Sequence, residues 1–418
     1  MTATADLLAF AAADHRLSPS TRAATLCLLG DTLAVGAAGS TAPGAVGVFE
    51  AAQGWGSGGR SRLLGHPGTL PAPSAAFVNG FNIHCLEWDA VHEGAVVHAL
   101  SVVVAAAAAA CHRHGGVDPE DALTAIAVGV DMAAGLGIAA TSPLAFFRPA
   151  IAGTIGAALA VARIDGVRAV ADVLGLAHAA CAGTMQAHVE GSIALPLQIA
   201  NAARAAVAAV DLVKAGLTGP HDALEGSFGH FVLFDHGDLA TYTRTLGKRW
   251  LIEEVCTKPW PCGRASHGVL GALADLHASI AGREVVTIEA RVPSLVVRLV
   301  GRSWLETMTP AYARLCLSVL AALMLRDGRI DPRAFDALPP PAPLLLVDDG
   351  NPDPNALSPQ HIVVTLADGT RFERAIAATP GSPGSDFDSD AKLALARELA
   401  PAADARIFDD PLAWLTAA

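Results

Sequence analysis

Aromatic and charged residues are scarce in this sequence. Phe, Trp and Tyr make up 5% of its 418 residues and charged residues 16%, whereas hydrophobic residues reach 52%. The core must therefore be built largely from Ala, Val and Leu, and small side chains allow helices to approach closely. The composition predicts a mostly helical protein that is long enough for two or three domains.

Positive charge is scarce as well. The 28 Lys and Arg residues stand against 40 Asp and Glu residues, which gives a formal net charge of -12. Because a nucleic-acid partner needs basic side chains to neutralise its phosphates, we expect none. The positive mean hydropathy predicts instead that apolar surface is buried between subunits.

Signals for disulfides, secretion and membranes are also missing. The seven cysteines form no CxxC pair, which is typical of buried thiols in a reducing cytoplasm. Asp6 and Asp14 interrupt the apolar start, so it does not resemble a signal peptide. The apolar run at 99–110 is shorter than the roughly 20 residues of a membrane span. We expect a cytoplasmic protein with no membrane partner.

Hydrophobic periodicity separates two regions of the chain. Successive helices are predicted in the first half, and β-branched runs at 283–293 and 361–377 predict strands, the second with an Asp-Gly turn. We expect a large all-helical domain at 1–257, completed by 385–418, and a smaller α+β lid domain at 258–384.

The segment NGFNIHCLEWDAVHEGAVVHA at 79–99 concentrates titratable side chains. If a helix from about residue 71 continues through it, then Glu87, Asp89 and His92 point to a common side. A second helix is expected from Ala99, with His98 in its first turn.

The position of His98 favours proton-transfer chemistry. The positive end of a helix dipole favours a neutral imidazole, and a neutral histidine that faces carboxylates can move protons near neutral pH. The alternative is that these histidines are merely solvated or hydrogen-bonded. Zinc is a weaker hypothesis, because His84, His92 and His98 form no HxxxH or HxH pair.

A second group of candidate residues lies at the predicted domain junction. KPWPCGRASHG at 258–268 supplies Lys258, Arg264 and His267, and ligand sites prefer junctions where Arg and Lys can hold a carboxylate. The alternative is a rigid hinge with solvated basic residues. Arg148, beside Pro149, either binds an anion or ends a helix.

Four segments, in this order, resemble the MmgE/PrpD family. The segment at 79–99 is similar to the family's NGxxxHxLDFDDTH…HP pattern, and GTIGAALAVARIDG at 153–166 is similar to its GTxGAAAAAxxLLG helix. LTGPHDALEGSFG at 217–229 resembles FTGPxxxLEGxxG, and KPWPCGRASH at 258–267 resembles KxYPCCxxxH. The resemblance implies a homodimer without metal or organic cofactor, and an active site between a helical domain and a lid.

Several residues match the family pattern. Glu87 and Asp89 take the places of its two aspartates, and His98 that of the histidine in HP. Lys258 matches the loop lysine, and His267 matches the histidine nine positions later.

Other positions depart from the pattern. Val91 replaces a threonine, Leu195 a lysine and Gln198 a histidine. Gly263 stands where the decarboxylase branch has histidine, and Arg148 lies near the usual His-Pro.

The resemblance implies a cofactor-independent lyase that removes a proton α to a carboxylate of a small carboxylic acid, in a dehydratase-like elimination. His98 would be the general base and Lys258 would stabilise the enediolate-like charge. Glu87 or Asp89 would orient His92 or donate to a leaving hydroxyl. Candidate substrate-binding residues are Arg148, Arg264, His267, His188 and Glu190, the last two in place of the missing lysine and histidine.

Two alternatives remain open. The first is an epimerase or isomerase of a dicarboxylate, in which one group removes the proton and another returns it. The second is a catalytically degenerate binding or assembly subunit, which the replacements at Leu195 and Gln198 favour. For His188 and Glu190 the alternative is a solvated helix end.

Overall fold

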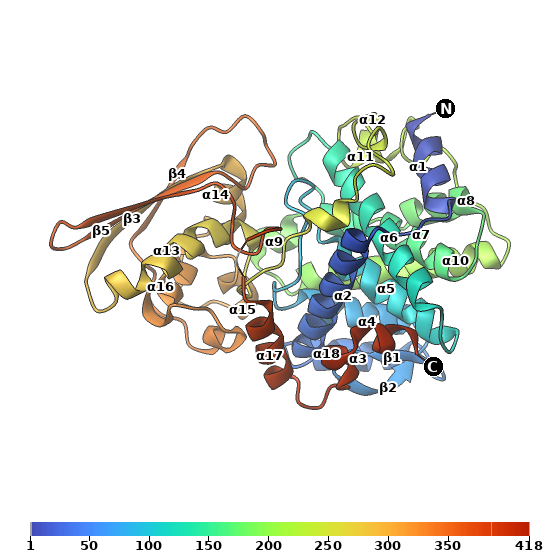
Figure 1. Cartoon of the computed structure of the whole chain (residues 1–418), viewed down its shortest axis with the longest axis horizontal. Coiled ribbons are helices and arrows are strands. Elements are labelled where there is room, and N and C mark those ends of the chain that lie inside the picture. Colours follow the sequence, from blue (N-terminus) through green and yellow to red (C-terminus); the bar gives the residue numbers. More distant parts are fainter. Residues whose placement is uncertain (1, 386, 418) are drawn as a thin grey trace.

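The computed structural model describes residues 2–385 and 387–417. The protein is mostly helical with a smaller α+β part, which confirms the predicted fold class (Figure 1). A helical bundle lies at one end of the molecule and carries both chain ends, and a small sheet with its helices lies at the other. The main helices of the bundle are α1 (Ala3–Ala12), α2 (Pro19–Gly39), α3 (Ala45–Gly54), α4 (Ala72–His84), α5 (Ala99–Arg113), α6 (Pro119–Ala139), α7 (Arg148–Ile164), α8 (Val170–Ala179), α9 (Gln186–Glu190) and α10 (Ala194–Lys214).

Short elements connect these helices. A two-stranded antiparallel hairpin precedes α4, and brief helical turns follow α10. They are β1 (Ser61–Leu63), β2 (His66–Leu70), α11 (His230–Leu233), α12 (Ala240–Thr243) and the 3-10 helices η1 (Leu251–Glu254) and η2 (Arg264–Ser266).

Helix α5 runs through the middle of the bundle. Every residue from Ala99 to His112 is buried, and the helix packs against α4, α6, α7 and α10. Its alanines favour the helical conformation and leave room for neighbouring helices on all sides. This packing fixes the start of α5 relative to the end of α4, where the candidate site lies.

Glycines allow α6 and α7 to cross closely. A Cβ added to Gly129 would lie 2.9 Å from the carbonyl oxygen of Gly156 and 2.8 Å from the Cβ of Ala160. Contacts this short require the backbones to move apart. The small-residue pattern of 153–166 is therefore a packing feature of the core.

Helix α6 is long and apolar enough, by length and composition, to cross a membrane. However, 94% of its most apolar window is buried inside the protein, as is typical of a core helix. Its one interior acid, Asp131, accepts hydrogen bonds from the Tyr242 hydroxyl at 2.5 Å and from the Leu251 amide at 2.7 Å. These bonds belong to the fold of the bundle.

The sheet has the order β4-β3-β5-β6. Its strands are β3 (Val285–Val292), β4 (Leu344–Asp348), β5 (Gln360–Leu366) and β6 (Arg371–Ile376). Strand β3 pairs with β4 in parallel and with β5 antiparallel, and β5 and β6 form the expected hairpin, with Gly369 at φ 84° in its turn. Residues of β5 alternate between buried and half-buried, so one face of the sheet is covered.

Helices α13 (His267–Ile280) and α16 (Leu317–Asp327) pack together, and α13 contacts β5 and β6. The remaining elements of this part are α14 (Ser294–Val300), α15 (Pro310–Ala313) and η3 (Pro332–Asp336). Helices α15 and α16 are separate because Cys316, which lies between them, is extended, with φ -107° and ψ 95°. Strand β4 follows the Pro-rich segment 339–343 and lies outside the two strand regions that the sequence predicted.

The C-terminal segment returns to the bundle. Its helices α17 (Ser389–Leu399), α18 (Arg406–Asp409) and α19 (Pro411–Thr416) all contact α2. The Lys392 ammonium lies 2.6 Å from the Asp31 carboxylate of α2 and donates to the carbonyl oxygen of Trp88 at 3.1 Å. The domain boundaries and the homodimer remain predictions.

His112 joins α5 to the β1 strand and to α19. Its Nδ1 accepts from the Arg62 amide at 3.1 Å, and its Nε2 donates to the carbonyl oxygen of Trp414 at 2.9 Å. Burial, the largest cause, lowers the pKa of His112 to about 4. Because Nδ1 is used as an acceptor, the folded protein holds this ring neutral.

We expect the Gly129→Ala variant to have a free energy of unfolding lower by about 1–3 kcal/mol, because the new methyl group forces α6 and α7 apart. Urea denaturation measures the change. The matched control is Gly47→Ala in α3, where a Cβ would meet nothing within 4 Å, and it should be neutral or stabilising by up to about 1 kcal/mol. Equal effects in the two variants would contradict the close crossing.

His112 should make stability depend on pH. Its pKa is about 4 in the folded protein against an ordinary value of 6.5, so its contribution is complete above pH 6.5 and is lost as the pH falls toward 4. In His112→Gln, the fall in unfolding free energy between pH 6 and 4.5 should be shallower by about 1.4 kcal/mol per pH unit. Urea denaturation across pH tests this, with the exposed His221→Gln as control; an unchanged slope would refute the assignment.

Candidate active site

The loop between α4 and α5 carries the titratable side chains. Helix α4 ends at His84, so the expected helical continuation through His92 is wrong. Glu87 and Val96 both have φ 53°, a left-handed conformation that a right-handed helix cannot contain. His98 is the N-cap of α5, close to the expected first-turn position.

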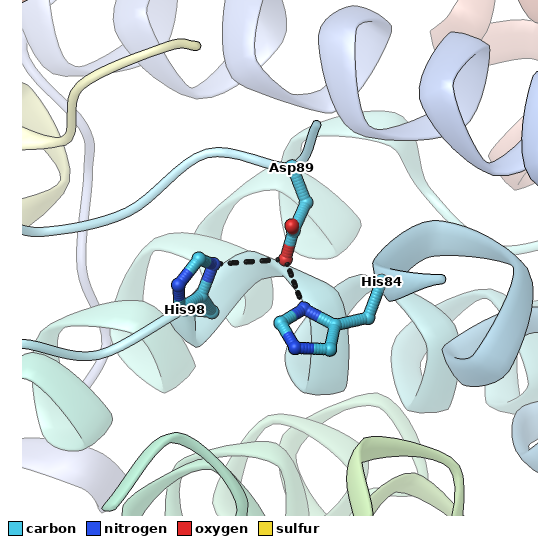
Figure 2. Close-up of side chains that lie close together, drawn as sticks. All are labelled: His84, Asp89 and His98. Atoms are coloured by element: carbon cyan, nitrogen blue, oxygen red, sulfur yellow. Dashed lines mark hydrogen bonds and ion pairs between the residues drawn. The ribbon is translucent and has the colours of Figure 1, made fainter. Parts of the chain in front are cut away.

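The Asp89 carboxylate is the centre of this loop (Figure 2). Its Oδ2 accepts hydrogen bonds from His84 Nδ1 at 2.8 Å, from His98 Nδ1 at 3.0 Å and from the Ser101 hydroxyl. Asp89 is completely buried and His84 is 1% exposed. Because an ionised carboxylate only accepts, both imidazoles must carry their proton on Nδ1 at this contact.

Lys258 reaches the same loop from the second half of the chain. Its Nζ donates to the carbonyl oxygen of Glu87 at 2.9 Å and to the Glu87 carboxylate at 3.2 Å, and it lies 3.5 Å from Asp89 Oδ1. The side chain has no exposed surface. A buried ammonium needs such acceptors, because unpaired burial of a charge is very costly.

Charge balance within this group fixes the protonation states. Burial favours the neutral acid of Glu87, but Lys258, then His84 and His98, outweigh it and lower the pKa of Glu87 to about 2. The pKa of Asp89 is held well below its usual range by the two histidines and Lys258, again against burial. The group therefore holds two negative carboxylates, Glu87 and Asp89, and one positive ammonium, Lys258. One further positive charge would make its net charge zero.

The pKa values of the two histidines are shifted in opposite directions. Burial disfavours a charged His84, but the carboxylates of Asp89 and Glu87 outweigh it, so the pKa of His84 lies above its usual value. For His98, burial dominates over Asp89 and lowers the pKa. A charged His84 and a neutral His98 on one carboxylate complete the charge balance.

His98 presents a free base. With Nδ1 donating to Asp89, the neutral ring carries its lone pair on Nε2, and among the residues described nothing hydrogen-bonds to that atom. The side chain is 14% exposed and lines a cavity. An imidazole oriented in this way by a carboxylate can accept a proton from a bound molecule.

The cavity lies between the bundle and the α+β part. The space open to the centre of a water-sized sphere is about 70 Å³, where one water needs roughly 10–15 Å³. Polar side chains on its wall are His84, Glu87, His98, His188 and Arg264. Apolar residues from α7, α10, α14 and the loops make up most of the remaining wall.

His92 does not share the environment of Asp89. Its Nδ1 accepts from the Ala95 amide at 3.1 Å, and its Nε2 lies 3.6 Å from the Glu254 carboxylate. The expected common side for Glu87, Asp89 and His92 is therefore wrong, because it assumed a helix that the chain leaves at His84.

Arg148 and Arg264 are engaged by the protein itself. Arg148 forms a bidentate pair with Asp235, both distances being 2.9 Å, and donates to three further oxygen atoms. Arg264 donates to Glu93 at 2.5 Å, and its remaining nitrogen atoms bond to Thr257 and the segment 379–382. Their assignment to substrate carboxylates stays a prediction, and these contacts leave few donors for it.

The other predicted binding residues lie at different depths. His267 is completely buried beside Cys262 Sγ, at 3.5 Å, and burial, aided by Arg264 and Lys258, holds its pKa well below the usual value. His188 lines the cavity, and burial lowers its pKa to about 4. Glu190 is exposed and pairs with Gln186, as the solvated-helix-end alternative predicted.

Sequence reasoning missed two members of the Asp89 group. His84 matches the histidine of the family's NGxxxHxLDFDDTH…HP pattern, but no role was predicted for it from the sequence. Ser101 gave no signal, because a serine inside an Ala-rich helix is ordinary. Tertiary structure brings both to Asp89 together with His98.

His84, Asp89 and His98 are also close enough to hold a metal ion, since one ligand atom of each lies within 4.8 Å of the others. Two features favour hydrogen bonds between these three side chains over a shared metal ion. Both Nδ1 atoms lie at hydrogen-bond distance from one carboxylate oxygen, and the Lys258 ammonium lies 3.5 Å from the other. A cation there would displace both donors and would be repelled by the ammonium. The absence of a metal cofactor stays a prediction.

Comparison with known proteins identifies the family. Residues 4–242, which include the whole α4–α5 loop, match the MmgE/PrpD N-terminal domain. This chain belongs to the MmgE/PrpD family. Membership confirms the resemblance that the four sequence motifs indicated, and Lys258 and the α+β part lie outside the matched region.

Curated relatives of this MmgE/PrpD chain are decarboxylases by name. It is 26% identical to the human cis-aconitate decarboxylase over 291 residues, which cover 66% of this chain and 60% of the relative. A cis-aconitate decarboxylase-like protein of Aspergillus oryzae is 28% identical, with coverage of 62% and 58%. The mouse cis-aconitate decarboxylase is 26% identical, with coverage of 75% and 68%. The chain thus spans about three fifths of the first two relatives.

We expect the MmgE/PrpD site to need no metal. After dialysis against EDTA the melting temperature should equal that of the untreated protein, and added zinc chloride should not raise it, because the Asp89 group is already satisfied by protons and Lys258. Differential scanning fluorimetry measures this. A zinc-dependent rise that disappears in Asp89→Ala, but persists in the control Asp368→Ala on the sheet hairpin, would contradict the expectation.

Proposed function

We propose that this protein is a cofactor-independent lyase that acts on a small carboxylic acid by abstracting the proton α to a carboxylate. The observation that carries the proposal is the His98–Asp89 pair, in which Nδ1 is bonded to the carboxylate and the ring lines the cavity. Membership of the MmgE/PrpD family and decarboxylase relatives support the lyase class.

The two histidines divide the acid and base roles. His98 Nε2 takes the α-proton, and the C–H electrons form the new double bond as the neighbouring C–O bond breaks. The leaving hydroxyl receives the proton on His84 Nε2, which lines the cavity, has no hydrogen-bond partner and lies 3.6 Å from Glu87. Water leaves, and proton exchange with solvent restores both rings. Environments that push the pKa values of two groups apart commonly define such a pair.

Asp89 and Lys258 support this chemistry without touching the cavity. Asp89 stabilises the imidazolium that forms on His98, as a carboxylate does in a catalytic triad. Lys258 neutralises Glu87 and Asp89, so we assign it charge balance and positioning. Glu87 lines the cavity as a carboxylate, because its pKa is about 2, and it holds the charge on His84.

The test follows a panel of small hydroxy and unsaturated acids by NMR in deuterated water. Wild-type protein should form an alkene product, and His98→Gln should lose about 10² to 10⁴ in kcat/KM. His84→Gln should lose elimination but still exchange the α-proton for deuterium, because the base remains. His361→Gln, a half-buried histidine of β5 that pairs with Glu373, is the control and should match wild type.

Other outcomes of this experiment decide between the alternatives. Deuterium incorporation by the wild type without any alkene would contradict elimination and support an epimerase. Binding of acids with no turnover would contradict a lyase and support a binding subunit. Wild-type rates in His98→Gln would refute the assignment of the base.

A further inference from the structure

Helix α17 of the C-terminal segment turns a lysine toward the bundle. Lys392 and Ala396 are its buried residues, and the Lys392 side chain is 1% exposed. Because lysine is almost never fully buried unless its charge is paired, its place on the packing face of a helix calls for a reason. Lys392 lies outside the segment 4–242 that matches the family and outside the four sequence motifs.

The Lys392 ammonium contacts two other segments of the chain. It lies 2.6 Å from Asp31 Oδ1 on α2, and it donates to the carbonyl oxygen of Trp88 at 3.1 Å. It also lies 5.3 Å from the centre of the Trp88 ring, a cation–π distance. The carbonyl belongs to the planar peptide that joins Trp88 to Asp89. The hydrogen bond therefore fixes the orientation of the peptide immediately before Asp89.

Two consecutive carbonyls of the α4–α5 loop are held by buried lysines. The Glu87 carbonyl accepts from Lys258 at 2.9 Å. The next carbonyl, that of Trp88, accepts from Lys392, and the Trp88 indole Nε1 donates to the carbonyl oxygen of Pro259 at 3.2 Å. Glu87 has a left-handed φ of 53°, and such a conformation persists only where the surroundings fix it. Lysines from two distant segments supply this constraint.

The packing of α17 on α2 does not by itself need a charge. Replacement of a buried ion pair by apolar side chains of similar volume is often neutral or stabilising, because the loss of water by two charges offsets much of their attraction. An apolar side chain offers no N–H, however, and would leave the buried Trp88 carbonyl without its donor. The ammonium is therefore needed at the loop rather than between the two helices.

We propose that Lys392 is a positioning residue of the active site, whose bond to the Trp88 carbonyl orients Asp89 and, through Asp89, the His98 imidazole. Lys392 is not among the described residues that line the cavity, so it acts through the loop. Misplacement of a catalytic group by about 1 Å can cost about a hundred-fold in rate. This inference rests on the proposed function for the reaction and adds a residue of the C-terminal segment to the support of the site.

Proton NMR of the full-length protein tests the position of Asp89 without requiring turnover. The Nδ1 protons of His84 and His98 are held in hydrogen bonds to this buried carboxylate, so each should exchange slowly with water and give a downfield resonance. His84→Gln and His98→Gln identify the two resonances, because each variant removes one of them.

Two variants separate the hydrogen bond from the ion pair. Asp31→Leu/Lys392→Met removes both charges together and leaves the Trp88 carbonyl without its donor, so the His98 resonance should shift upfield or disappear through exchange with water. Asp31→Asn breaks the ion pair but keeps the Lys392 amine, which donates to a carbonyl whether or not it is charged, so the resonance should stay. Lys214→Met, which breaks a partly exposed ion pair at the end of α10, is the control and should match wild type.

Kinetics test the consequence, with the acid of the panel that the wild type converts fastest. The double variant should lose about ten-fold to a hundred-fold in kcat, with KM within about two-fold of wild type, because Lys392 touches no substrate. Asp31→Asn should keep kcat within about three-fold of wild type, because the bond to the Trp88 carbonyl remains.

An unchanged His98 resonance in the folded double variant would overturn the inference. Loss of that resonance in Asp31→Asn would overturn it as well, since the ion pair rather than the hydrogen bond would then hold the loop, and this comparison decides alone if the double variant does not fold. If the wild type converts none of the acids, the proposed function fails, while the NMR comparison still decides the role of Lys392.

Discussion

Burial of the Asp89 carboxylate sets the conditions for the rest of the site. A charge in this position needs compensation, and it receives hydrogen bonds from His84, His98 and Ser101 and the field of Lys258. Removing the Lys258 ammonium would leave the buried carboxylates without their compensating charge, at a cost of several kcal/mol. The same hydrogen bonds therefore hold the loop in place and orient the imidazoles of His84 and His98, because both depend on the Asp89 carboxylate.

The helical bundle makes this burial possible. Asp89 lies in a loop, and its partners come from the end of α4, the start of α5 and a distant segment. Small residues let α5 pack against four neighbours, and the glycine crossing of α6 and α7 continues this dense packing. A rigid bundle keeps two helix ends a few ångströms apart, so that one carboxylate can reach both histidines.

The cavity combines groups from both parts of the chain. The bundle provides His84, Glu87, His98 and His188, and the segments after residue 257 provide Arg264 and the apolar residues of α14. A few polar side chains stand in a mostly apolar wall, as is typical of sites for small molecules.

Much of this was predictable from local patterns. Periodicity predicted the helical first half and the β5–β6 hairpin, and the four motifs predicted the family. The motifs also selected Glu87, Asp89, His98 and Lys258, which the structure brings together and whose roles stay predictions. These features depend on short-range spacing, which a sequence displays directly. Strand β4 was not predicted, because its five residues follow a run of prolines and its pairing with β3 is long-range.

The sequence by itself determined the fold class, the family and the titratable residues of the α4–α5 loop. Only the tertiary structure decided that α4 ends at His84, that His92 turns to Glu254 and that His84 and Ser101 join Asp89. It also decided that Arg148 and Arg264 are hydrogen-bonded to acceptors of the protein, whereas Nε and Nη2 of Arg302 have no hydrogen-bond partner among the described residues. The physical reason is that protonation and pairing depend on which charges are buried together, and residues far apart in the chain meet only when the helices pack.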